Sequence, residues 1–231
     1  MISCTPLAPR FIAIVGGSGS GKSWLGHRLG EYFGMQAARV SLDDFYRDRS
    51  HLSRQRRESI NFDHPNAIDW PAFQKWIVTV RAGRPAMVPH YDFKTHTRKT
   101  ESRPWTPAPL ILIEGLWLLW RAAVRRLFDF SFFVDCPSDI RLQRREKRDV
   151  AERGRTRTSV RRQFRQVVSP MHEIYVAPQI RWADMVLSHP IGEADVYRVA
   201  VRLTDLLPPA GPWMGPSEPS CETNSWRVCS L

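Results

Sequence analysis

The chain has 231 residues, of which 42% are hydrophobic and 25% are charged, as expected for one globular domain. Its longest apolar run, 109–120, is interrupted by Glu114 and is shorter than the roughly 20 residues of a membrane-spanning helix, which argues against a membrane protein. The net charge of +11 suggests nucleic acid as a partner. Most of this charge is concentrated in one segment, however, because 11 Lys or Arg residues and only three acids lie between Arg141 and Arg165. On charge alone, a solvated helix face is the preferred interpretation of this basic cluster. A polyphosphate site and a nucleic-acid surface explain it equally well as alternatives.

The ends of the chain and its cysteines predict a cytoplasmic protein. No basic stretch followed by an apolar core occurs near the N-terminus, so we expect no export signal. The four cysteines (Cys4, Cys136, Cys221 and Cys229) are far apart and form no CxxC pair, which predicts neither a zinc site nor a disulfide framework.

In chain order, short apolar runs alternate with segments of helical spacing. Strands are predicted at 11–15, 37–41, 110–114, 130–134 and 185–187, and helices at 22–33, 71–82, 117–128, 139–149, 158–167 and 193–207. Strands that alternate with helices predict an α/β fold with a mainly parallel sheet flanked by helices. Two segments depart from this rhythm: about 87–101 reads as a hairpin or loop, and 208–231, with five prolines, as a disordered tail.

A glycine-rich segment between the first strand and the first helix predicts a phosphate loop. It consists of Gly16, Gly17, Ser18, Gly19, Ser20, Gly21, Lys22 and Ser23 and matches G-x-x-x-x-G-K-[ST], the pattern of the P-loop NTPase fold. Its glycines allow main-chain N–H groups to face phosphate oxygens. Lys22 is then expected to reach the β- and γ-phosphates, and the Ser23 hydroxyl to ligate Mg²⁺. The alternative, a flexible glycine turn, does not require Lys-Ser at the start of the next helix. The sequence contains no N-K-x-D guanine motif, which argues against a GTPase.

The second predicted strand is followed by Asp43 and Asp44, where an α/β sheet opens its ligand crevice. A carboxylate there could deprotonate an acceptor hydroxyl. A helix N-cap is locally an equally plausible role for one of the two aspartates.

Several short motifs, in order, resemble the uridine/cytidine kinase family over about residues 10–190. They are LDDFY at 42–46, NFDHP at 61–65, YDF at 91–93 with His96 and Arg98, EG at 114–115, RR at 144–145 with RD at 148–149, ERGR at 152–155, QF at 163–164, PM at 170–171 and AD at 183–184. The resemblance implies an ATP-dependent kinase that phosphorylates the 5′-hydroxyl of uridine or cytidine.

The resemblance also implies roles for residues on the acceptor side. Asp43 corresponds to the catalytic base, and Asp63 to the carboxylate that holds the ribose hydroxyls, a pair of donors that one carboxylate accepts well. Tyr91, Phe93 and His96 correspond to the base pocket, where stacking combines with hydrogen bonds.

Further residues correspond to the metal site and to an Arg-rich helical lid at about 141–167. Glu114, at the end of a strand, is implied to orient Mg²⁺ together with Ser23. Arg145, Arg155 and Gln163 correspond to substrate- and phosphate-facing positions of the lid, with Arg148 and Arg153 as helpers. Guanidinium groups there would neutralise the transferring phosphoryl group, so Lys22, Asp43 and Arg155 are the expected catalytic residues.

The sequence as a whole therefore predicts a P-loop nucleoside kinase domain over 1–207. Its expected ligands are a nucleoside and Mg²⁺ with ATP, or GTP as an alternative donor, and the family implies a homo-oligomer. A related kinase acting on another ribosyl or sugar-phosphate acceptor, of the phosphoribulokinase or nicotinamide riboside kinase kind, is the second hypothesis. An RNA-binding module using 141–165 is the third, and its binding would weaken steeply with salt.

Overall fold

The computed structural model describes residues 8–99, 101–105 and 108–207, so the predicted tail at 208–231 lies outside the described residues. Its centre is a five-stranded, entirely parallel sheet with the order β2-β7-β1-β8-β9. The strands are β1 (Arg10–Gly16), β2 (Ala37–Ser41), β7 (Leu110–Gly115), β8 (Phe130–Asp135) and β9 (Met185–Ser188). The predicted fold class and all five predicted strands are confirmed.

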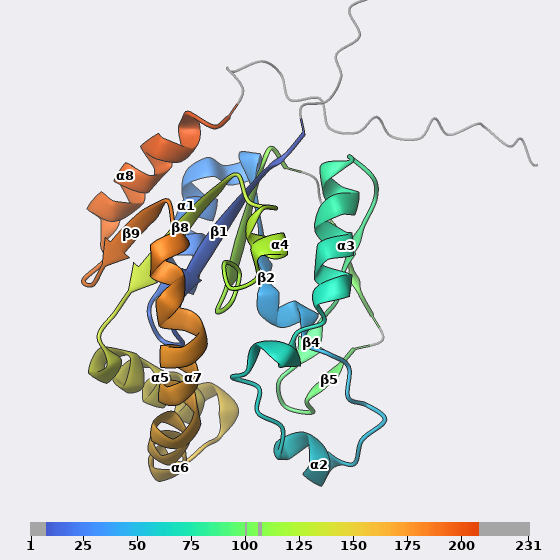
Figure 1. Cartoon of the computed structure of the whole chain (residues 1–231), viewed down its shortest axis with the longest axis vertical. Helices are drawn as coiled ribbons and strands as arrows, with labels where there is room; N and C mark the ends of the chain where they lie inside the picture. The colour runs from blue at the N-terminus through green and yellow to red at the C-terminus, as the bar shows by residue number, and fades with distance from the viewer. Residues whose placement is uncertain (1–7, 100, 106–107, 208–231) are drawn as a thin grey trace, which may run out of the picture.

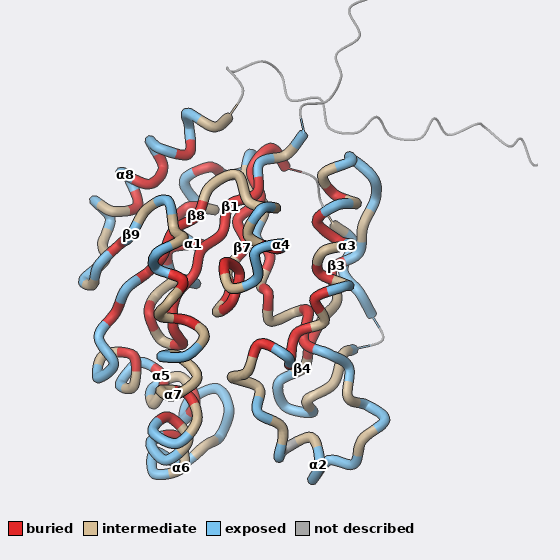
Figure 2. Tube along the Cα trace, viewed as in Figure 1, coloured by how far each residue is buried: buried red, intermediate tan, exposed pale blue. Residues whose placement is uncertain are grey.

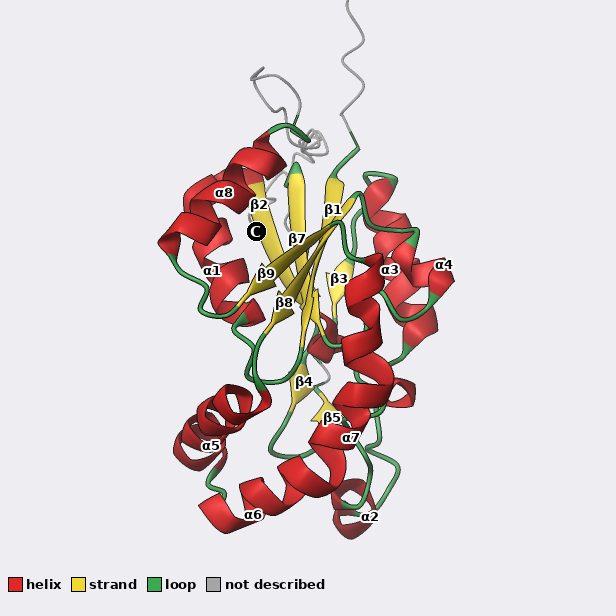
Figure 3. Cartoon of the chain, turned by 60° about the vertical axis from the view of Figure 1, so that its left-hand side comes forward, coloured by secondary structure: helices red, strands yellow, loops and turns green. Residues whose placement is uncertain are grey.

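Helices cover both faces of this sheet (Figures 1 and 3). One face carries α1 (Lys22–Phe33) and α8 (Glu193–Thr204), and the other carries α3 (Trp70–Arg81) and the short α4 (Ala122–Arg125). Beyond the carboxyl ends of the strands lie α2 (Arg54–Glu58), α5 (Ser138–Arg153), α6 (Arg157–Gln163) and the small strands β4 (Tyr91–Asp92) and β5 (Thr97–Arg98). None of the helices in the described part of the chain is long and apolar enough to span a bilayer.

Alternation along β1 divides the core into two layers. Ile12 and Ile14 pack with Leu25 and Leu29 of α1 on one face, while Phe11, Ala13 and Val15 pack with the aromatic residues of α3 on the other. Successive side chains of a strand point to opposite faces, so a strand that is apolar throughout requires cover on both sides. Figure 2 shows this buried band running through the central strands. The sheet is thereby fixed, and its carboxyl ends form a rigid base for the loops that follow.

The hairpin expected at about 87–101 is present as two short antiparallel pairs. The inner pair is β4 with β5, and the outer pair is β3 (Met87–Val88) with β6 (Arg103–Pro104). The Arg98 guanidinium donates to the main-chain oxygens of Tyr46 and Phe45 and forms an ion pair with Asp69. The hairpin is thus anchored to the segment that follows β2.

The helix predicted at 117–128 is wrong. Only α4 is helical, because Trp117, Leu118 and Leu119 are consecutive and all buried, so they cannot share one face of a helix. Gln179 stabilises the irregular segment instead: its amide donates to the Leu116 carbonyl, and its carbonyl accepts from the Leu119 N–H. A distant side chain therefore replaces the helical hydrogen bonds.

The helix predicted at 158–167 extends further along the chain than expected. After α6, helical backbone continues through Phe164–Val168, α7 (Ser169–Met171), His172–Val176 and Ala177–Trp182. Two of these segments have π-helical hydrogen bonding, and they precede or follow Pro170. Proline removes an N–H donor and crowds the preceding turn, and a widened turn accommodates both effects without ending the helix.

Candidate functional site

The phosphate loop follows β1 directly and ends at the first turn of α1. Gly19 and Gly21 have φ angles of 81° and 105°, which L side chains rarely adopt, and a Cβ on Gly19 would lie 2.5 Å from the Arg141 main-chain oxygen. The N-cap of α1 is Gly21, without a side-chain cap and without an acid in the first turn. The first N–H groups of this helix and its positive end are therefore available to an anion.

Lys22 lies inside this loop, where its ammonium donates to the Gly17 carbonyl at 3.5 Å. Burial lowers the pKa of Lys22, and the nearby carboxylates of Glu114 and Asp43 oppose that shift. The ammonium is thus held between the loop and two acids near the carboxyl ends of the neighbouring strands β7 and β2.

A cavity of about 1040 Å³ opens beside the loop and brings most predicted site residues together. Its lining includes Ser18, Lys22, Ser23, Asp43, Asp63, Tyr91, Phe93, His96, Glu114, Arg145, Arg155 and Gln163. The remaining predicted residues, Gly16, Gly17, Gly19, Ser20 and Gly21, form the loop itself and are not part of the lining. A second hollow, of about 730 Å³ beside Lys75 and Val78 on α3, contains none of the predicted residues.

Asp43 lies in a 3-10 helix, Leu42–Phe45, that begins directly after β2. The N-cap is Ser41, whose hydroxyl accepts the Asp43 N–H at 3.3 Å, so the cap is not one of the aspartates. Burial raises the pKa of Asp43, while Lys22 opposes the shift. Asp44 does not line the cavity, and its carboxylate pairs with Arg103 at 2.7 Å. The two neighbouring acids are therefore separated: one faces the cavity and the other fixes the hairpin.

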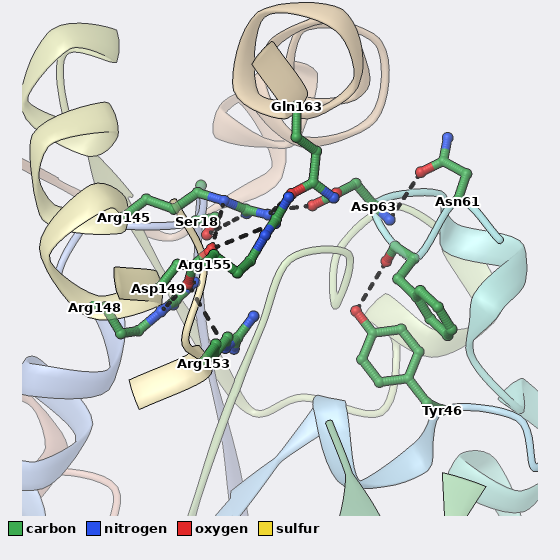
Figure 4. Close-up of polar contacts among 12 residues, drawn as sticks. Ser18, Tyr46, Asn61, Asp63, Arg145, Arg148, Asp149, Arg153, Arg155 and Gln163 are labelled. Atoms are coloured by element: carbon green, nitrogen blue, oxygen red, sulfur yellow. Dashed lines mark hydrogen bonds and ion pairs between the residues drawn. The ribbon is translucent and has the colours of Figure 1, made fainter. Parts of the chain in front are cut away.

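Asp63 faces the cavity from a loop that hydrogen bonds hold in place (Figure 4). The Asp63 N–H donates to the Asn61 side chain at 2.9 Å, and the Tyr46 hydroxyl donates to the Phe62 carbonyl at 2.9 Å. The carboxylate lies 3.6 Å from Arg145, and its pKa is raised by burial, an effect that Arg145 opposes. Asp63 and Arg145 thus connect the acceptor side of the cavity with the lid.

Aromatic rings form the recess at the hairpin end of the cavity. His96 stacks on Phe62, with ring centroids 4.6 Å apart and an interplanar angle of 14°. Tyr91 lies against Phe93 and Tyr46, and its buried hydroxyl has no hydrogen-bond partner among the described residues. His96 adopts the left-handed conformation, with φ of 56°, within the turn between β4 and β5. These rings present flat surfaces and at least one unused polar group to a ligand.

Sequence reasoning did not assign two of these ring residues. Tyr46 and Phe62 both line the recess, and both lie inside motifs that were noted for their aspartates. The available signal was an aromatic residue close to an acid in each motif: Phe62 directly precedes Asp63, and Tyr46 follows Asp44 by two positions.

The lid is formed by α5 and α6, and its polar side chains interlock above the cavity (Figure 4). Arg145 donates to the Ser18 hydroxyl at 3.0 Å and to the Gln163 carbonyl at 3.2 Å. Arg155 also donates to Gln163, and to the Ser159 hydroxyl at 2.9 Å. The Arg153 guanidinium lies 4.9 Å from the Phe93 ring, a cation–π contact with the hairpin. The lid therefore contacts the phosphate loop on one side and the acceptor recess on the other.

Glu114 is the penultimate residue of β7 and lies between Ser41 of β2 and Ile14 of β1. Its Oε2 is buried without a hydrogen-bond partner among the described residues. A buried carboxylate oxygen without a partner is costly, so this oxygen requires a cation or a donor supplied by a ligand.

A parallel sheet with a phosphate loop after β1, together with a cavity that extends from this loop across the strand ends to the hairpin, defines a P-loop kinase. In fold the chain is similar to phosphoribulokinase from Rhodobacter spheroides, with a TM-score of 0.57 and 17% identity over 80% of this chain and 71% of that one. It is also similar to D-glycerate 3-kinase from Cryptococcus neoformans, with a TM-score of 0.59 and 17% identity over 78% of this chain and 85% of that one.

Sequence comparison gives the family. The model of the phosphoribulokinase / uridine kinase family matches residues 11–194, so the chain belongs to that family. A protein of Clostridium perfringens named uridine kinase is 37% identical over 180 residues, which are 78% of this chain and 86% of that protein. A uridine kinase of Streptococcus pyogenes is 37% identical over 194 residues, which are 84% of this chain and 92% of that protein. The resemblance and the enzyme class expected from the motifs, a kinase acting on an alcohol, are confirmed.

Proposed function

We propose that the protein phosphorylates the 5′-hydroxyl of a pyrimidine ribonucleoside, uridine or cytidine, with ATP as the donor. The observation that carries this proposal is the single cavity that leads from the Lys22 end of the phosphate loop, past Asp43, to the aromatic recess. The relatives named uridine kinase support the choice of acceptor. The products would be UMP or CMP and ADP, so the reaction would return free pyrimidine nucleosides to the nucleotide pool of the cytoplasm.

In the proposed reaction Asp43 is the general base. The 5′-oxygen bonds to the γ-phosphorus while the bond from that phosphorus to the β,γ-bridging oxygen breaks, and the hydroxyl proton passes to the Asp43 carboxylate. Burial raises the pKa of this carboxyl, which makes it a stronger base, while Lys22 keeps it ionised. Proton acceptance and phosphate binding therefore depend on neighbouring but separate groups.

The phosphoryl group in transit carries charge that the surrounding cations would stabilise. Lys22 approaches from the phosphate loop, and Arg145, Arg148 and Arg155 approach from the lid. Fixed cations in a cavity closed to water stabilise developing charge without reorganising at the moment of reaction. This role accounts for the basic cluster at 141–165 without nucleic acid.

The residues present fit a Mg²⁺ ion that arrives with the triphosphate. Ser23 and the unpartnered Oε2 of Glu114 belong to the same cavity, although no three His, Cys, Asp or Glu side chains of the described residues are grouped as a metal site of their own. Mg²⁺ is commonly held by one or two protein ligands, with phosphate oxygens and waters completing its shell. When bound, the ion would neutralise charge on the β- and γ-phosphates. Ser23 and Glu114 would hold it at the end of β7.

The acceptor recess has the chemistry that a pyrimidine nucleoside requires. The Asp63 carboxylate can accept hydrogen bonds from both ribose hydroxyls. The rings of Phe62 and Phe93 can stack on a base, and the Tyr91 hydroxyl can bond to its polar edge. The donor site should discriminate less between ATP and GTP, because its main-chain amides would contact phosphates that both nucleotides share.

A panel of acceptors tests the proposal directly. Formation of ADP would be measured with uridine, cytidine, adenosine, nicotinamide riboside, ribulose 5-phosphate and D-glycerate, each with ATP and with GTP. We expect turnover with uridine or cytidine to exceed that with the other acceptors by at least tenfold. Rapid phosphorylation of a sugar phosphate or another riboside, with only background rates for both pyrimidine nucleosides, would overturn the choice of acceptor.

A further inference from the structure

Four arginines of the lid surround one buried aspartate. Asp149 lies in α5, has no exposed surface and does not line the cavity. Its carboxylate lies 2.8 Å from Arg148, 3.4 Å from Arg145, 3.6 Å from Arg153 and 3.9 Å from Arg155 (Figure 4). All four arginines line the cavity, so Asp149 stands behind them with respect to any ligand.

The local structure explains how one residue reaches all four. Arg145 and Arg153 lie four residues before and after Asp149 on the same helix, and such positions share a face. Gly154 then ends α5 in the left-handed conformation and reverses the chain. The N–H groups of Gly154 and Arg155 both donate to the main-chain oxygen of Asp149. Arg155 is thereby returned to the side of the helix from which Asp149 points.

The charges show why a carboxylate is needed there. Four guanidinium groups gathered around one point repel one another, and this repulsion is strong where water is excluded. Asp149 attracts each of them and neutralises one of their four charges. Asp63 lies 3.6 Å from Arg145 on the cavity side, and the cluster keeps a net positive charge. Asp149 Oδ2 accepts no hydrogen bond of normal geometry among the described residues, although Arg145 and Arg155 lie nearby. These two arginines are held by charge, while the hydrogen bonds that they donate go to Ser18, Gln163 and Ser159.

We propose that Asp149 is a positioning residue, which assembles the lid arginines around the phosphoryl group that is transferred. The inference rests on the proposed function only in that the chain is a phosphoryl-transfer enzyme, and it holds for any acceptor. Asp149 acts through Arg145 and Arg155 and does not contact the reacting atoms. Its contribution therefore exists only as long as the arginines that it holds are present.

The test is a double-mutant cycle between Asp149 and Arg155. Asp149→Asn keeps the shape of the side chain but removes its charge and turns an N–H₂ group toward guanidinium donors. We expect kcat to fall about 10- to 100-fold, as for misplacement of a catalytic group by about 1 Å, with smaller changes in the KM of ATP. In an Arg155→Ala background the same substitution should lower kcat by a clearly smaller factor, because part of what Asp149 positions is already absent.

A neighbouring carboxylate provides the matched control. Glu146 belongs to the same helix and pairs with Arg161 of α6, and neither lines the cavity. Glu146→Gln should change thermal stability only slightly, since partly exposed ion pairs contribute little, and should leave kcat within about twofold because neither partner lines the cavity. If Glu146→Gln lowers kcat as strongly as Asp149→Asn, general loosening of the lid explains both effects, and the proposal is overturned.

The remaining outcomes also decide the question. An Asp149→Asn enzyme with near-normal kcat, or one whose loss is equally large in the Arg155→Ala background, would overturn the positioning role. If Asp149→Asn does not fold, Asp149→Glu keeps the charge and moves it by one methylene, and the same cycle applies to it. All variants are assayed with the acceptor that the wild-type enzyme uses fastest. A wrong choice of nucleoside therefore appears in the acceptor panel and not in the cycle.

Discussion

The phosphate loop and the acceptor recess differ in the kind of structure that forms them. The loop is one continuous stretch, and its surface toward a ligand is mainly main-chain N–H groups that glycine conformations present. The recess joins side chains from three separate segments: Tyr46 just after the 3-10 helix, the NFDHP loop and the hairpin, and Arg153 of the lid lies against its Phe93 ring. A surface of main-chain groups binds a group common to many substrates, while a surface of side chains can distinguish one acceptor from another.

Electrostatics separate the same two regions. Lys22 is the loop's cation, and burial lowers its pKa. On the acceptor side, burial raises the pKa of both Asp43 and Asp63, and the lid arginines oppose the shift of Asp63. The acceptor wall of the cavity thus carries the carboxyl groups of Asp43 and Asp63, and the donor wall carries the ammonium group of Lys22. In the proposed reaction this polarity would orient an alcohol toward the terminal phosphate, so substitutions on the two walls should affect different kinetic constants.

The largest effect is expected for Asp43→Asn, because the acceptor wall loses its base while the donor wall is unchanged. We expect kcat to fall about 10²- to 10⁴-fold. The affinity for ATP, measured by calorimetry, should change by less than about threefold. Asp44→Asn is the control, since that neighbouring acid pairs with Arg103 outside the cavity and should retain most of the turnover. Comparable losses in both variants would show that the acids stabilise the loop and that neither is the base.

The donor wall is broken most directly by Gly19→Ala. The new Cβ would lie 2.5 Å from the Arg141 main-chain oxygen at a φ of 81°, so the loop must shift and its N–H groups move off the phosphates. Strain of about 1–3 kcal/mol corresponds to a Kd for ATP that rises about 5- to 150-fold. Gly34→Ala also creates strain, with a φ of 53°, but a Cβ there has no atom within 4 Å, and the site is not involved. Equal ATP affinity in the two variants would contradict this account of the loop.

The same contrast explains what the sequence could predict. The phosphate loop and the five strands are local patterns, so a motif and apolar runs of three to five residues were sufficient. The helix predicted at 117–128 failed because the decisive hydrogen bonds come from Gln179, 60 residues after Leu119. The link from Arg145 to Ser18 joins residues 127 positions apart, and no spacing along the chain indicates it.

For the recess, the resemblance to a family assigned roles to residues whose function physical reasoning alone would not have identified. His96 in isolation is an ordinary surface histidine, and only the folded hairpin stacks it on Phe62. Asp43 and Asp44 were equivalent in the sequence, and the difference between them arises from Arg103, which pairs with one. Side-chain assemblies of this kind depend on tertiary contacts, whereas the loop depends on glycine.

The dependence of the rate on pH sharpens the comparison for Asp43. A base must be deprotonated, so kcat/KM should fall tenfold per pH unit below its pKa. Because burial raises that pKa above the ordinary value of 3.8, the acid limb should lie at higher pH than for an exposed aspartate. The limb should be absent from the residual activity of Asp43→Asn and unchanged in Asp44→Asn. A profile in which all three enzymes share one acid limb would assign it to another group.

The smallest effect is expected for Tyr91→Phe, which removes one hydroxyl and keeps the ring. That hydroxyl is buried without a partner among the described residues, so its loss should leave thermal stability unchanged or slightly higher. A hydrogen bond to the base would contribute about 1 kcal/mol, and its loss should raise the KM of uridine about fivefold without changing the KM of ATP. Tyr197→Phe, on the exposed surface of α8, is the matched control. If Tyr91→Phe gains stability and keeps its KM for uridine, the hydroxyl does not contact the base.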